Sequence, residues 1–524
     1  MVELTALTSY ADAQRHCSPE KLWELFDGNA ARFNIAHECV DRFARTGRDA
    51  VMVAHADGSD ERISCADLAA DSSRFAHWLV AAGVQAGDRV ALMLEPSSAF
   101  YVSLFGTLKA GAVAVPMFTL FGPEGVRLRI ADCSPRVMVT NAEKAAQIGT
   151  LEGLTVIVFD DDFLRRLGAF SADFEIGTAA GDMAVFQYTS GTTRELPEAV
   201  RHTHRALVTL MLAGLYGTGL RPGDRFFCPS SPAWGHGLWH GTFAPLALGI
   251  CVGAYGGKFD PERLLQALAE HRITNLSAAA THYRMMRNSG AAERHRFCIE
   301  KLSFTGEPID GETAEWAEQT FGRPVCSMYG TTEIGVILVN YPGAQDFAVK
   351  PGSLGRPIPG LKIEVQDAFG MPAPVGVTGE LKLWRRGAWM STKDLARVDE
   401  DGYFWHGGRA DDVIVSAGWT IGAVEVEDAI MKHRDVSSVA VIGVPDDVRG
   451  QIVKAFVVSQ RPGDAAFEDE IKNLVRTRLS QHEYPRIVAF VDELPRNPAG
   501  KVNRKALREQ EAASRKQRSA EGGW

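Results

Sequence analysis

Residues 186–200 read FQYTSGTTRELPEAV, and the rest of the chain can be understood outward from them. The apolar, β-prone residues 183–188 are typical of a buried strand, and apolar sequence resumes at Val200. Between the two, small side chains allow backbone N–H groups and hydroxyls to surround one phosphate. A plain loop that joins two strands fits equally well, and the stretch is neither a Walker A loop nor a dinucleotide-binding fingerprint. The candidate phosphate-binding residues are Thr189, Ser190, Gly191, Thr192 and Thr193.

The composition is that of a globular protein with small-molecule ligands. Of the 524 residues 45% are hydrophobic and 23% are charged. A net charge of −9 provides no cationic field, which argues against nucleic acid or an anionic membrane as partner. The eight cysteines form no C-x-x-C pair, so reduced thiols in a cytoplasmic protein are expected rather than disulfides or zinc. Without a signal-peptide pattern or an 18-residue apolar run, export and membrane spanning are not expected.

Strand and helix patterns alternate along most of the chain. Helices are expected at 63–83, 97–110, 122–132, 205–215, 260–271, 280–289 and 311–321, and strands at 88–94, 112–116, 137–140, 183–188, 225–228, 274–278, 301–304 and 325–329. Such alternation predicts mostly parallel sheets with helices on their faces. Residues 229–240 hold too much Pro and Gly to start a helix, and too many aromatic residues for a plain surface loop. We interpret them as the wall of a pocket, with a buried turn as the alternative.

The composition changes beyond about residue 350. Frequent Pro and Gly leave short strands at 363–365 and 380–383, as in a small β-barrel or a distorted sheet. A small domain follows, with helices at 424–432 and near 471–479 and strands at 439–442, 454–458 and 487–491. The expected fold is α/β, with a large N-terminal domain (1–410) and a small C-terminal α+β domain (411–524). The charged tail after Lys505 is expected to fray.

Six separated motifs now fit one pattern. They lie at residues 189–193, 306–308, 329–333, 391–394, 408–412 and 495–502. In this order the chain resembles the adenylate-forming (ANL) superfamily, which contains acyl-CoA synthetases, adenylation domains of peptide synthetases and luciferases. Residues 408–427 and the segment around Trp234 are most similar to medium-chain and aryl acyl-CoA synthetases.

The resemblance implies a two-step reaction. ATP would activate a carboxylic acid to an acyl-adenylate with release of pyrophosphate, and coenzyme A would then accept the acyl group. Phosphoryl transfer of this kind depends on positioning and on charge neutralisation. The implied cofactors and co-substrates are ATP, Mg²⁺ and coenzyme A.

The resemblance also implies catalytic residues. Lys501 would bridge the substrate carboxylate and the nucleotide, Glu333 would hold Mg²⁺, and Thr332 belongs to the same motif. A solvated lysine and an ordinary acid at a strand end are the alternatives for Lys501 and Glu333.

Further residues are implied in nucleotide binding. Residues 189–193 would hold the β- and γ-phosphates, and Tyr329 would stack on adenine. Asp394 would accept hydrogen bonds from the ribose hydroxyls, to which Arg409 adds a donor. A core aromatic and a turn acid are the alternatives for Tyr329 and Asp394. The remaining members of this set are Gly306, Glu307, Pro308 and Gly330.

In the second half-reaction, relatives rotate the small C-terminal domain, which makes that domain mobile. Asp411 occupies the hinge position, and Gly418 would let pantetheine pass close to the backbone. The acyl pocket is expected at Trp234, His236, Leu238, Trp239 and Gly335, with His240 and Val336 as neighbours. Two tryptophans favour a flat or short pocket, and hence an aryl or medium-chain acid.

The phosphate-binding stretch departs from the family pattern. Relatives usually continue with Gly-x-Pro-Lys-Gly, whereas residues 194–199 read RELPEA, with one additional residue and an acid in place of Lys. Losing this cation should weaken pyrophosphate stabilisation by about 1.5–3 kcal/mol unless Arg194 or Arg201 replaces it. Thr420 stands where relatives often carry Arg, and we assign it no phosphate role.

An AMP-forming acyl-CoA synthetase, an acid-thiol ligase, is the expected function. Two alternatives remain open at this point. One is an adenylating enzyme that loads a separate carrier protein, and the other is a nucleotide-binding relative with impaired turnover. The expected partners are a small carboxylic acid, ATP and coenzyme A, and a homodimer is left open.

Overall fold

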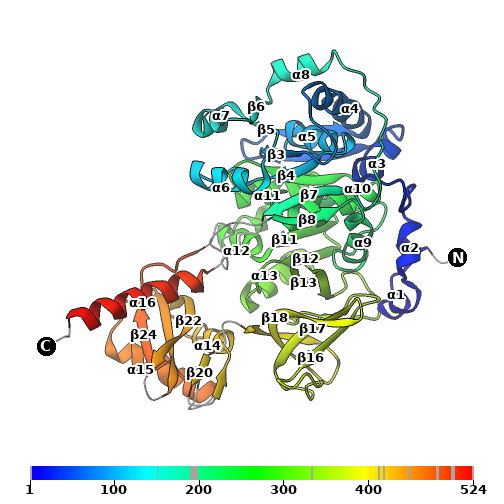
Figure 1. The fold of residues 1–524 in the computed structure, drawn as a ribbon. Coiled ribbons are helices and arrows are strands. Elements are labelled where there is room, and N and C mark those ends of the chain that lie inside the picture. The colour runs from blue at the N-terminus through cyan, green and yellow to red at the C-terminus, as the bar shows by residue number, and fades with distance from the viewer. Residues whose placement is uncertain are drawn as a thin grey trace. The chain divides into compact units, whose positions relative to one another are not determined.

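The computed structural model describes residues 3–149, 151–188, 199–331, 334–410, 414–416, 419–446, 449–479, 483–496 and 502–521. At residues 409, 415, 419–420 and 515–521 only the backbone is described. The described residues form two compact units, one up to Leu361 and one from Lys362 (Figure 1). The predicted boundary between residues 410 and 411 falls within the second unit and stays a prediction.

The described strands of the first unit form two sheets. The order of the six-stranded sheet is β6 (Thr155–Val158), β5 (Val137–Thr140), β3 (Arg89–Met93), β4 (Val113–Pro116), β7 (Met183–Tyr188) and β8 (Ala199–Thr203). The order of the nine-stranded sheet is β15 (Arg356–Pro357), β14 (Gly335–Val339), β13 (Val325–Thr331), β12 (Lys301–Thr305), β11 (Asn275–Ala279), β9 (Phe226–Cys228), β10 (Val252–Gly256), β1 (Asp49–His55) and β2 (Asp60–Ser64).

The first three helices of the first unit precede its strands, and the others connect them. They are α1 (Tyr10–His16), α2 (Pro19–Trp23), α3 (Ile35–Cys39), α4 (Cys65–Ala81), α5 (Ser98–Lys109), α6 (Pro123–Cys133), α7 (Ala142–Ile148), α8 (Asp161–Leu167), α9 (Ala206–Tyr216), α10 (Ala244–Ala247), α11 (Pro261–Glu270), α12 (Ala280–Ser289) and α13 (Gly311–Phe321). Hydroxyl side chains begin several of them, as Ser64 does by accepting a hydrogen bond from the N–H of Asp67. Gly106 brings α4 close to α5, because a Cβ there would lie 2.6 Å from the carbonyl oxygen of Ser72.

The predicted parallel architecture is confirmed. Strand β3 pairs in parallel with β4 and β5, and β4 pairs in parallel with β7. In the other sheet the neighbours from β1 through β10, β9, β11 and β12 to β13 are parallel throughout. Apolar side chains of β11, β12 and helices α11–α13 share one buried core. Parallel strands require such cover on their faces, and β11 and the three central residues of β12 are accordingly buried.

Residues 229–240 contain a helical start that the sequence did not predict. A π-helix, η3 (His236–Phe243), runs directly into α10. The glycines that suggested a helix breaker serve close packing instead. A Cβ at Gly237 would lie 2.3 Å from the carbonyl oxygen of Ser230, and one at Gly241 would lie 2.8 Å from Sγ of Cys228. The expectation that no helix starts in this segment was therefore wrong.

The second unit contains two further sheets among its described residues. The first is antiparallel, in the order β16 (Lys362–Gln366), β17 (Gly379–Arg385), β18 (Ala388–Val398) and β19 (Phe404–Arg409). The second has the order β21 (Trp419–Ile421), β20 (Ile414–Ser416), β23 (Gly450–Ser459) and β22 (Val436–Asp446), with β24 (Ile487–Phe490) paired to β23. Its helices are α14 (Ala423–Ile430), α15 (Ala465–Arg478) and α16 (Arg504–Glu521).

The expectation that the tail after Lys505 frays was wrong, because the structure has helix α16 there. Leu507 is 2% exposed and belongs to a buried cluster with residues of β22 and β23. At the start of the helix Nε of Arg504 donates to Oε1 of Glu427 over 3.1 Å. Further along, Lys454 and Glu511 form an ion pair of 2.5 Å. The charged sequence thus forms an amphipathic helix whose apolar face packs on the sheet. Within the described chain, every helix is too short or too polar to cross a lipid bilayer.

Candidate functional site

Three stretches that carry predicted active-site residues are each flanked by two residues that pair with each other. The pairs are Tyr188 with Ala199, Thr331 with Gly335 and Arg496 with Val502. Residues 189–198, 332–333 and 497–501 between them lie outside the described residues. The roles of residues 189–193, Thr332, Glu333 and Lys501 therefore stay predictions.

Trp234 and Gly306 bring the predicted acyl pocket and the predicted adenine pocket together. Gly306 directly follows β12 and has φ +101°, a conformation that favours glycine. A Cβ at this position would lie 2.7 Å from Cη2 of Trp234. The indole ring therefore lies against the Gly306 backbone, which only glycine permits.

Trp239 links the same segment to β7, the strand before the predicted phosphate-binding stretch. Its Nε1 donates to Oε1 of Gln187 over 3.0 Å, and Gln187 is 1% exposed. The ring of His202, on β8, lies with its centroid 4.8 Å from that of Trp239. Residues 234–239 thus contact both the β7–β8 hairpin and the end of β12. The hairpin strands and the Gly306 motif, which are far apart in the sequence, thus both contact this segment.

His236 lies inside this segment and is held neutral. Its Nδ1 is 2.9 Å from Oγ of Ser230, and its Nε2 is 2.8 Å from Oγ of Ser277. Burial, and secondarily the neighbouring His240 and His282, lower the pKa of His236 well below its usual range. Burial also lowers the pKa of His240 to about 4. Leu238 is fully buried beside them, and this part of the predicted acyl pocket is uncharged at neutral pH.

The segment after β12 is charged instead. Oε1 of Glu307 accepts from the hydroxyl of Thr281 over 2.7 Å and lies 3.4 Å from Nη1 of Arg284. Arg284 also pairs with Asp310 over 3.3 Å. Although burial acts to raise it, hydrogen bonds from Thr313 and Arg284 hold the pKa of Asp310 below its usual range. Pro308 is exposed beside them. These groups suit a polar ligand, in contrast to the neutral segment of His236.

Tyr329 and Gly330 lie at the end of β13, where the strand turns into β14. Tyr329 is half-buried and pairs with Leu338, and the register shifts before Gly330. A Cβ at Gly330 would lie 2.1 Å from the carbonyl oxygen of Gly335. Gly335 itself has φ +78° and is exposed. The glycines therefore allow two strands to approach closely beside the predicted adenine contact.

In the second unit, β18 and β19 place Asp394 directly opposite Arg409. Asp394 is 4% exposed, and its N–H donates to Oγ1 of Thr392 over 3.1 Å. Nε2 of His406 lies 3.6 Å from Oδ1 of Asp394. The two residues expected at the ribose are thus neighbours across a ladder, although 15 positions separate them in the sequence. Asp411 and Gly418 lie outside the described residues.

Two family models match the chain, and both are described as parts of an AMP-binding enzyme. The model of the enzyme matches residues 40–392, and the model of its C-terminal domain matches residues 425–501. The chain belongs to the AMP-binding enzyme family. The predicted domain boundary near residue 411 lies between the two matched ranges.

Relatives of this AMP-binding enzyme align along nearly the whole chain. It is 30% identical to the acetyl-coenzyme A synthetase of Bacillus subtilis, with 96% of this chain and 95% of that protein covered. The crystal structure of an acyl-CoA synthetase from Brucella canis is 30% identical, covers 97% of this chain and 100% of its own, and has a TM-score of 0.75. ATP-bound MatB from Rhodopseudomonas palustris is 28% identical, covers 91% and 98%, and has a TM-score of 0.80.

These relationships establish the class of reaction. The protein is an AMP-forming acid–CoA ligase, which uses ATP and coenzyme A and forms an acyl-CoA through adenylation. The resemblance to the ANL superfamily is confirmed. A carrier-protein loader and a relative without turnover are not favoured by these relatives.

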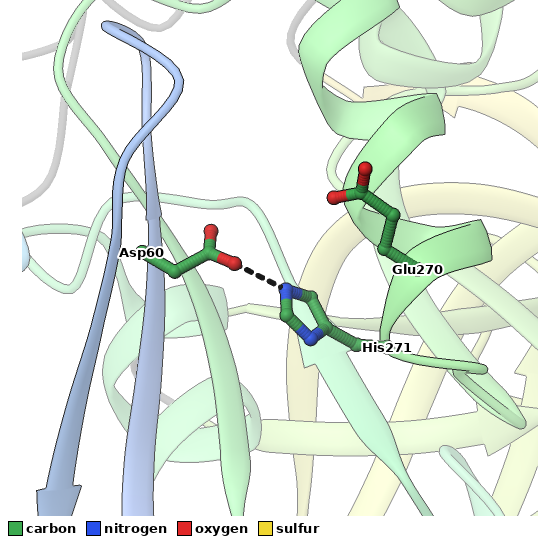
Figure 2. A group of neighbouring side chains, drawn as sticks. All are labelled: Asp60, Glu270 and His271. Carbon is green, nitrogen blue, oxygen red and sulfur yellow. Dashed lines mark ion pairs between the residues drawn. The ribbon is translucent and has the colours of Figure 1, made fainter.

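A cluster of Asp60, Glu270 and His271 in this ligase has the residue types of a metal site. Figure 2 shows Asp60 and His271 facing each other, with Nε2 of His271 2.8 Å from Oδ2 of Asp60, and Glu270 on the end of α11. However, the guanidinium of the buried Arg263 pairs with Asp60 and lies 3.7 Å from Glu270. A cation already compensates both carboxylates. We interpret the cluster as an ion-pair network that links β2 to the end of α11. It was not predicted because Asp60 is far from Glu270 and His271 in the sequence.

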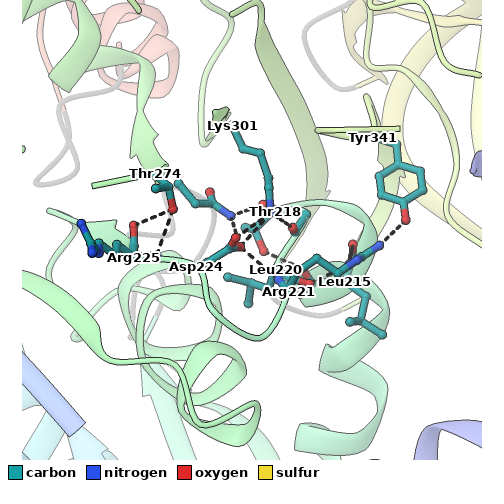
Figure 3. A network of polar contacts seen from close by, with 12 residues as sticks. Leu215, Thr218, Leu220, Arg221, Asp224, Arg225, Thr274, Lys301 and Tyr341 are labelled. Carbon is teal, nitrogen blue, oxygen red and sulfur yellow. Dashed lines mark hydrogen bonds and ion pairs between the residues drawn. The ribbon is translucent and has the colours of Figure 1, made fainter. Parts of the chain in front are cut away.

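A second unpredicted network surrounds Asp224 and Lys301 (Figure 3). Nζ of Lys301 lies 2.8 Å from both carboxylate oxygens of Asp224, and Nδ2 of Asn275 donates to the same carboxylate over 3.1 Å. Lys301 and Asn275 are the first residues of β12 and β11. The network therefore lies at the amino ends of these strands, whereas Gly306 lies at the carboxyl end, where α/β enzymes bind their ligands. It is a structural feature of the ligase.

Proposed function

We propose that the enzyme activates an aryl or medium-chain carboxylic acid with MgATP and transfers the acyl group to coenzyme A. The observation that supports this choice of acid is the contact of Trp234 with Gly306 beside the neutral His236. A flat indole face suits an aromatic ring or a short alkyl chain. Because His236 and His240 carry no charge at neutral pH, this segment offers no cation to a second carboxylate on the substrate.

The nucleotide would bind at the carboxyl ends of β12 and β13. Tyr329 would stack on adenine beside Gly306, Glu307, Pro308 and Gly330, and Asp394 and Arg409 would bind the ribose hydroxyls. The pairing of Asp394 with Arg409 in the sheet supports their common role. Glu333, with Thr332, would hold Mg²⁺, because a hard cation prefers carboxylate oxygen.

In the first step an oxygen of the substrate carboxylate forms a bond to the α-phosphorus of ATP, and pyrophosphate leaves. Lys501 would compensate the negative charge that the carboxylate and the α-phosphate bring together. In the second step the sulfur of coenzyme A attacks the acyl carbon, and AMP leaves with the electron pair of the broken bond. Asp411 would serve as the hinge between the two steps, and Gly418 would leave room for pantetheine.

The test is pyrophosphate release from MgATP with a panel of benzoates and C4 to C10 acids, with and without coenzyme A. The wild type should release pyrophosphate with one subset of acids, and acyl-CoA should form only when coenzyme A is present. Lys501→Ala should lower the rate at least about 100-fold, the effect of removing one preorganised charge contact from the transition state. Lys505→Ala is the matched control, because Lys505 is 45% exposed and pairs with Glu509 in α16.

Release with acetate or long-chain acids alone would refute the proposed acid. Equal losses in the two lysine variants would refute the role of Lys501. Absence of release with every acid, despite ATP binding, would refute the proposed function.

A further inference from the structure

Arg129 of α6 lies against the end of the β7–β8 hairpin. Its guanidinium carbon is 3.7 Å from the ring centroid of Phe121 and 5.4 Å from that of Tyr188. Tyr188 is the last residue of β7 and pairs with Ala199, the first residue of β8. The cation therefore lies at the end of the hairpin from which the predicted phosphate-binding stretch departs.

The described residues give this cation no anion. Nη1 of Arg129 donates to the carbonyl oxygen of Gly125 over 2.8 Å, whereas Nε is buried and has no hydrogen-bond partner there. The nearby carboxylate of Asp132 accepts from the Tyr188 hydroxyl over 2.6 Å, and no described carboxylate forms an ion pair with Arg129. Burial lowers the pKa of Arg129, as expected for a cation that loses water without gaining a counter-charge.

A guanidinium held in this way is prepared for an anion. The contact with the Phe121 ring restrains the guanidinium of Arg129, so little side-chain freedom is lost when a ligand binds. Arginine binds phosphate through parallel N–H···O bonds, which are stronger than neutral hydrogen bonds. The sequence at 194–199 creates the need for such a group, because Glu198 stands where relatives usually carry lysine.

We propose that Arg129 binds the polyphosphate of ATP and supplies the cation that residues 194–199 lack. The inference rests on the proposed function. During adenylation the bond between the α-phosphorus and the oxygen bridging to the β-phosphate breaks, and its electron pair leaves with pyrophosphate. Arg129 compensates the charge that accumulates on this leaving group.

Arg201 is a weaker candidate for the same role. It pairs with Phe186 across the hairpin, two residue pairs from the Tyr188–Ala199 end, and its guanidinium carbon lies 5.0 Å from the Phe186 ring centroid. It is also exposed, and water therefore screens its charge. Arg127, on α6 and exposed, provides a matched control for a charge change on the same helix.

The experiment compares Arg129→Gln with Arg127→Gln and Arg129→Lys. Titration calorimetry measures binding of MgATP and of magnesium pyrophosphate, and acid-dependent ATP–pyrophosphate exchange measures the half-reaction. Arg129→Gln should weaken pyrophosphate binding and lower exchange by about 10- to 100-fold, the range for a charge-assisted contact. Arg129→Lys should recover part of this loss, and Arg127→Gln should behave as the wild type. The KM for coenzyme A should stay unchanged in all three.

A raised KM for coenzyme A with normal pyrophosphate binding would overturn the proposal and assign the guanidinium to a phosphate of coenzyme A. Unchanged binding of all ligands would overturn it as well. If Arg129→Gln lowers the melting temperature, the proposal requires that Arg129→Lys restores folding yet still binds pyrophosphate more weakly than the wild type. Failure of the wild type to exchange with any acid, with pyrophosphate binding still dependent on Arg129, would refute the proposed function alone.

Discussion

Two segments leave the same edge of the nine-stranded sheet and differ in chemistry. One follows β9 and contains Trp234 and His236, and the other follows β12 and contains Gly306 and Glu307. The first is uncharged and contains neutral histidines, whereas the second carries an ion-pair network with Arg284. They touch where Trp234 covers Gly306. Under the proposed function, both segments lie where α/β enzymes bind their ligands, and the neutral segment takes the acid whereas the charged segment takes the nucleotide.

Acid should distinguish the two segments. The folded-state pKa of His236 and His240 lies below the unfolded value near 6.5, so both stay neutral in the folded protein while the unfolded chain gains protons. Their stabilising contribution is complete above about pH 6.5 and falls by ~1.4 kcal/mol per pH unit for each histidine on acidification. The unfolding free energy measured in urea should therefore fall by about 1.5 kcal/mol between pH 6.5 and pH 5 from His240, and His236 should add to this fall in the same direction.

The charged segment should respond at lower pH. The pKa of Asp310 is lower in the folded protein than the value near 3.8 in the unfolded chain. Its carboxylate therefore stabilises the fold above about pH 3.8, and this contribution is lost as the pH falls through the folded-state pKa. His240→Gln should thus flatten the pH dependence above pH 5, and Asp310→Asn should leave that range unchanged. Equal slopes in the wild type and His240→Gln between pH 6.5 and pH 5 would contradict the neutral state of this histidine.

Gly306→Ala should break the contact between the two segments. The new Cβ would lie 2.7 Å from the Trp234 ring at φ +101°, so we expect a loss of about 2–4 kcal/mol in unfolding free energy from overpacking and backbone strain. Chemical denaturation measures the loss, and the KM for ATP should rise as well. Gly311→Ala is the control, because nothing lies within 4 Å of a Cβ there. A similar loss in both variants would show that the Trp234 contact is not its cause.

Glu307→Gln should affect only the charged segment. Its pair with Arg284 is partly exposed, so we expect less than about 1 kcal/mol of lost stability. The KM for ATP should rise several-fold while the KM for the acid stays constant. Steady-state kinetics with each substrate varied in turn measures this separation. Glu312→Gln is the matched control, because Glu312 is 82% exposed and pairs with Arg287 on the same α12–α13 side. A larger change in the KM for the acid than in that for ATP would contradict the division between the segments.

Local sequence predicted most of the parallel framework. Strands such as β3 and β4 were recognisable because burial on both faces makes them almost continuously apolar. The π-helix η3 was missed because Gly237 and Gly241 look like helix breakers, whereas their role depends on Ser230 and Cys228 packing against them. Helix α16 was missed because its apolar face is narrow, and only its contact with β22 and β23 reveals it.

Only part of the candidate site was predictable from the sequence. The motifs around Gly306, Tyr329 and Asp394 were recognised because they are local in sequence, whereas the pairing of Asp394 with Arg409 was not predicted and their ribose roles stay predictions. The neutral state of His236 could not be predicted, because it depends on Ser277 and on burial contributed by distant segments. Arg129 gave no signal either, since its proximity to Tyr188 arises only when α6 packs on the hairpin.

The pairing of Tyr188 with Ala199 also allows the predicted phosphate-binding stretch to be replaced. The register of the hairpin is fixed by its strands, so the chain between them can change in length without displacing the sheet. This explains how the stretch can carry an additional residue and an acid while the framework around it keeps the form of its relatives. Under the proposed function, a stretch taken from another ligase and inserted between the same two residues would change the rate of the first half-reaction independently of acid recognition.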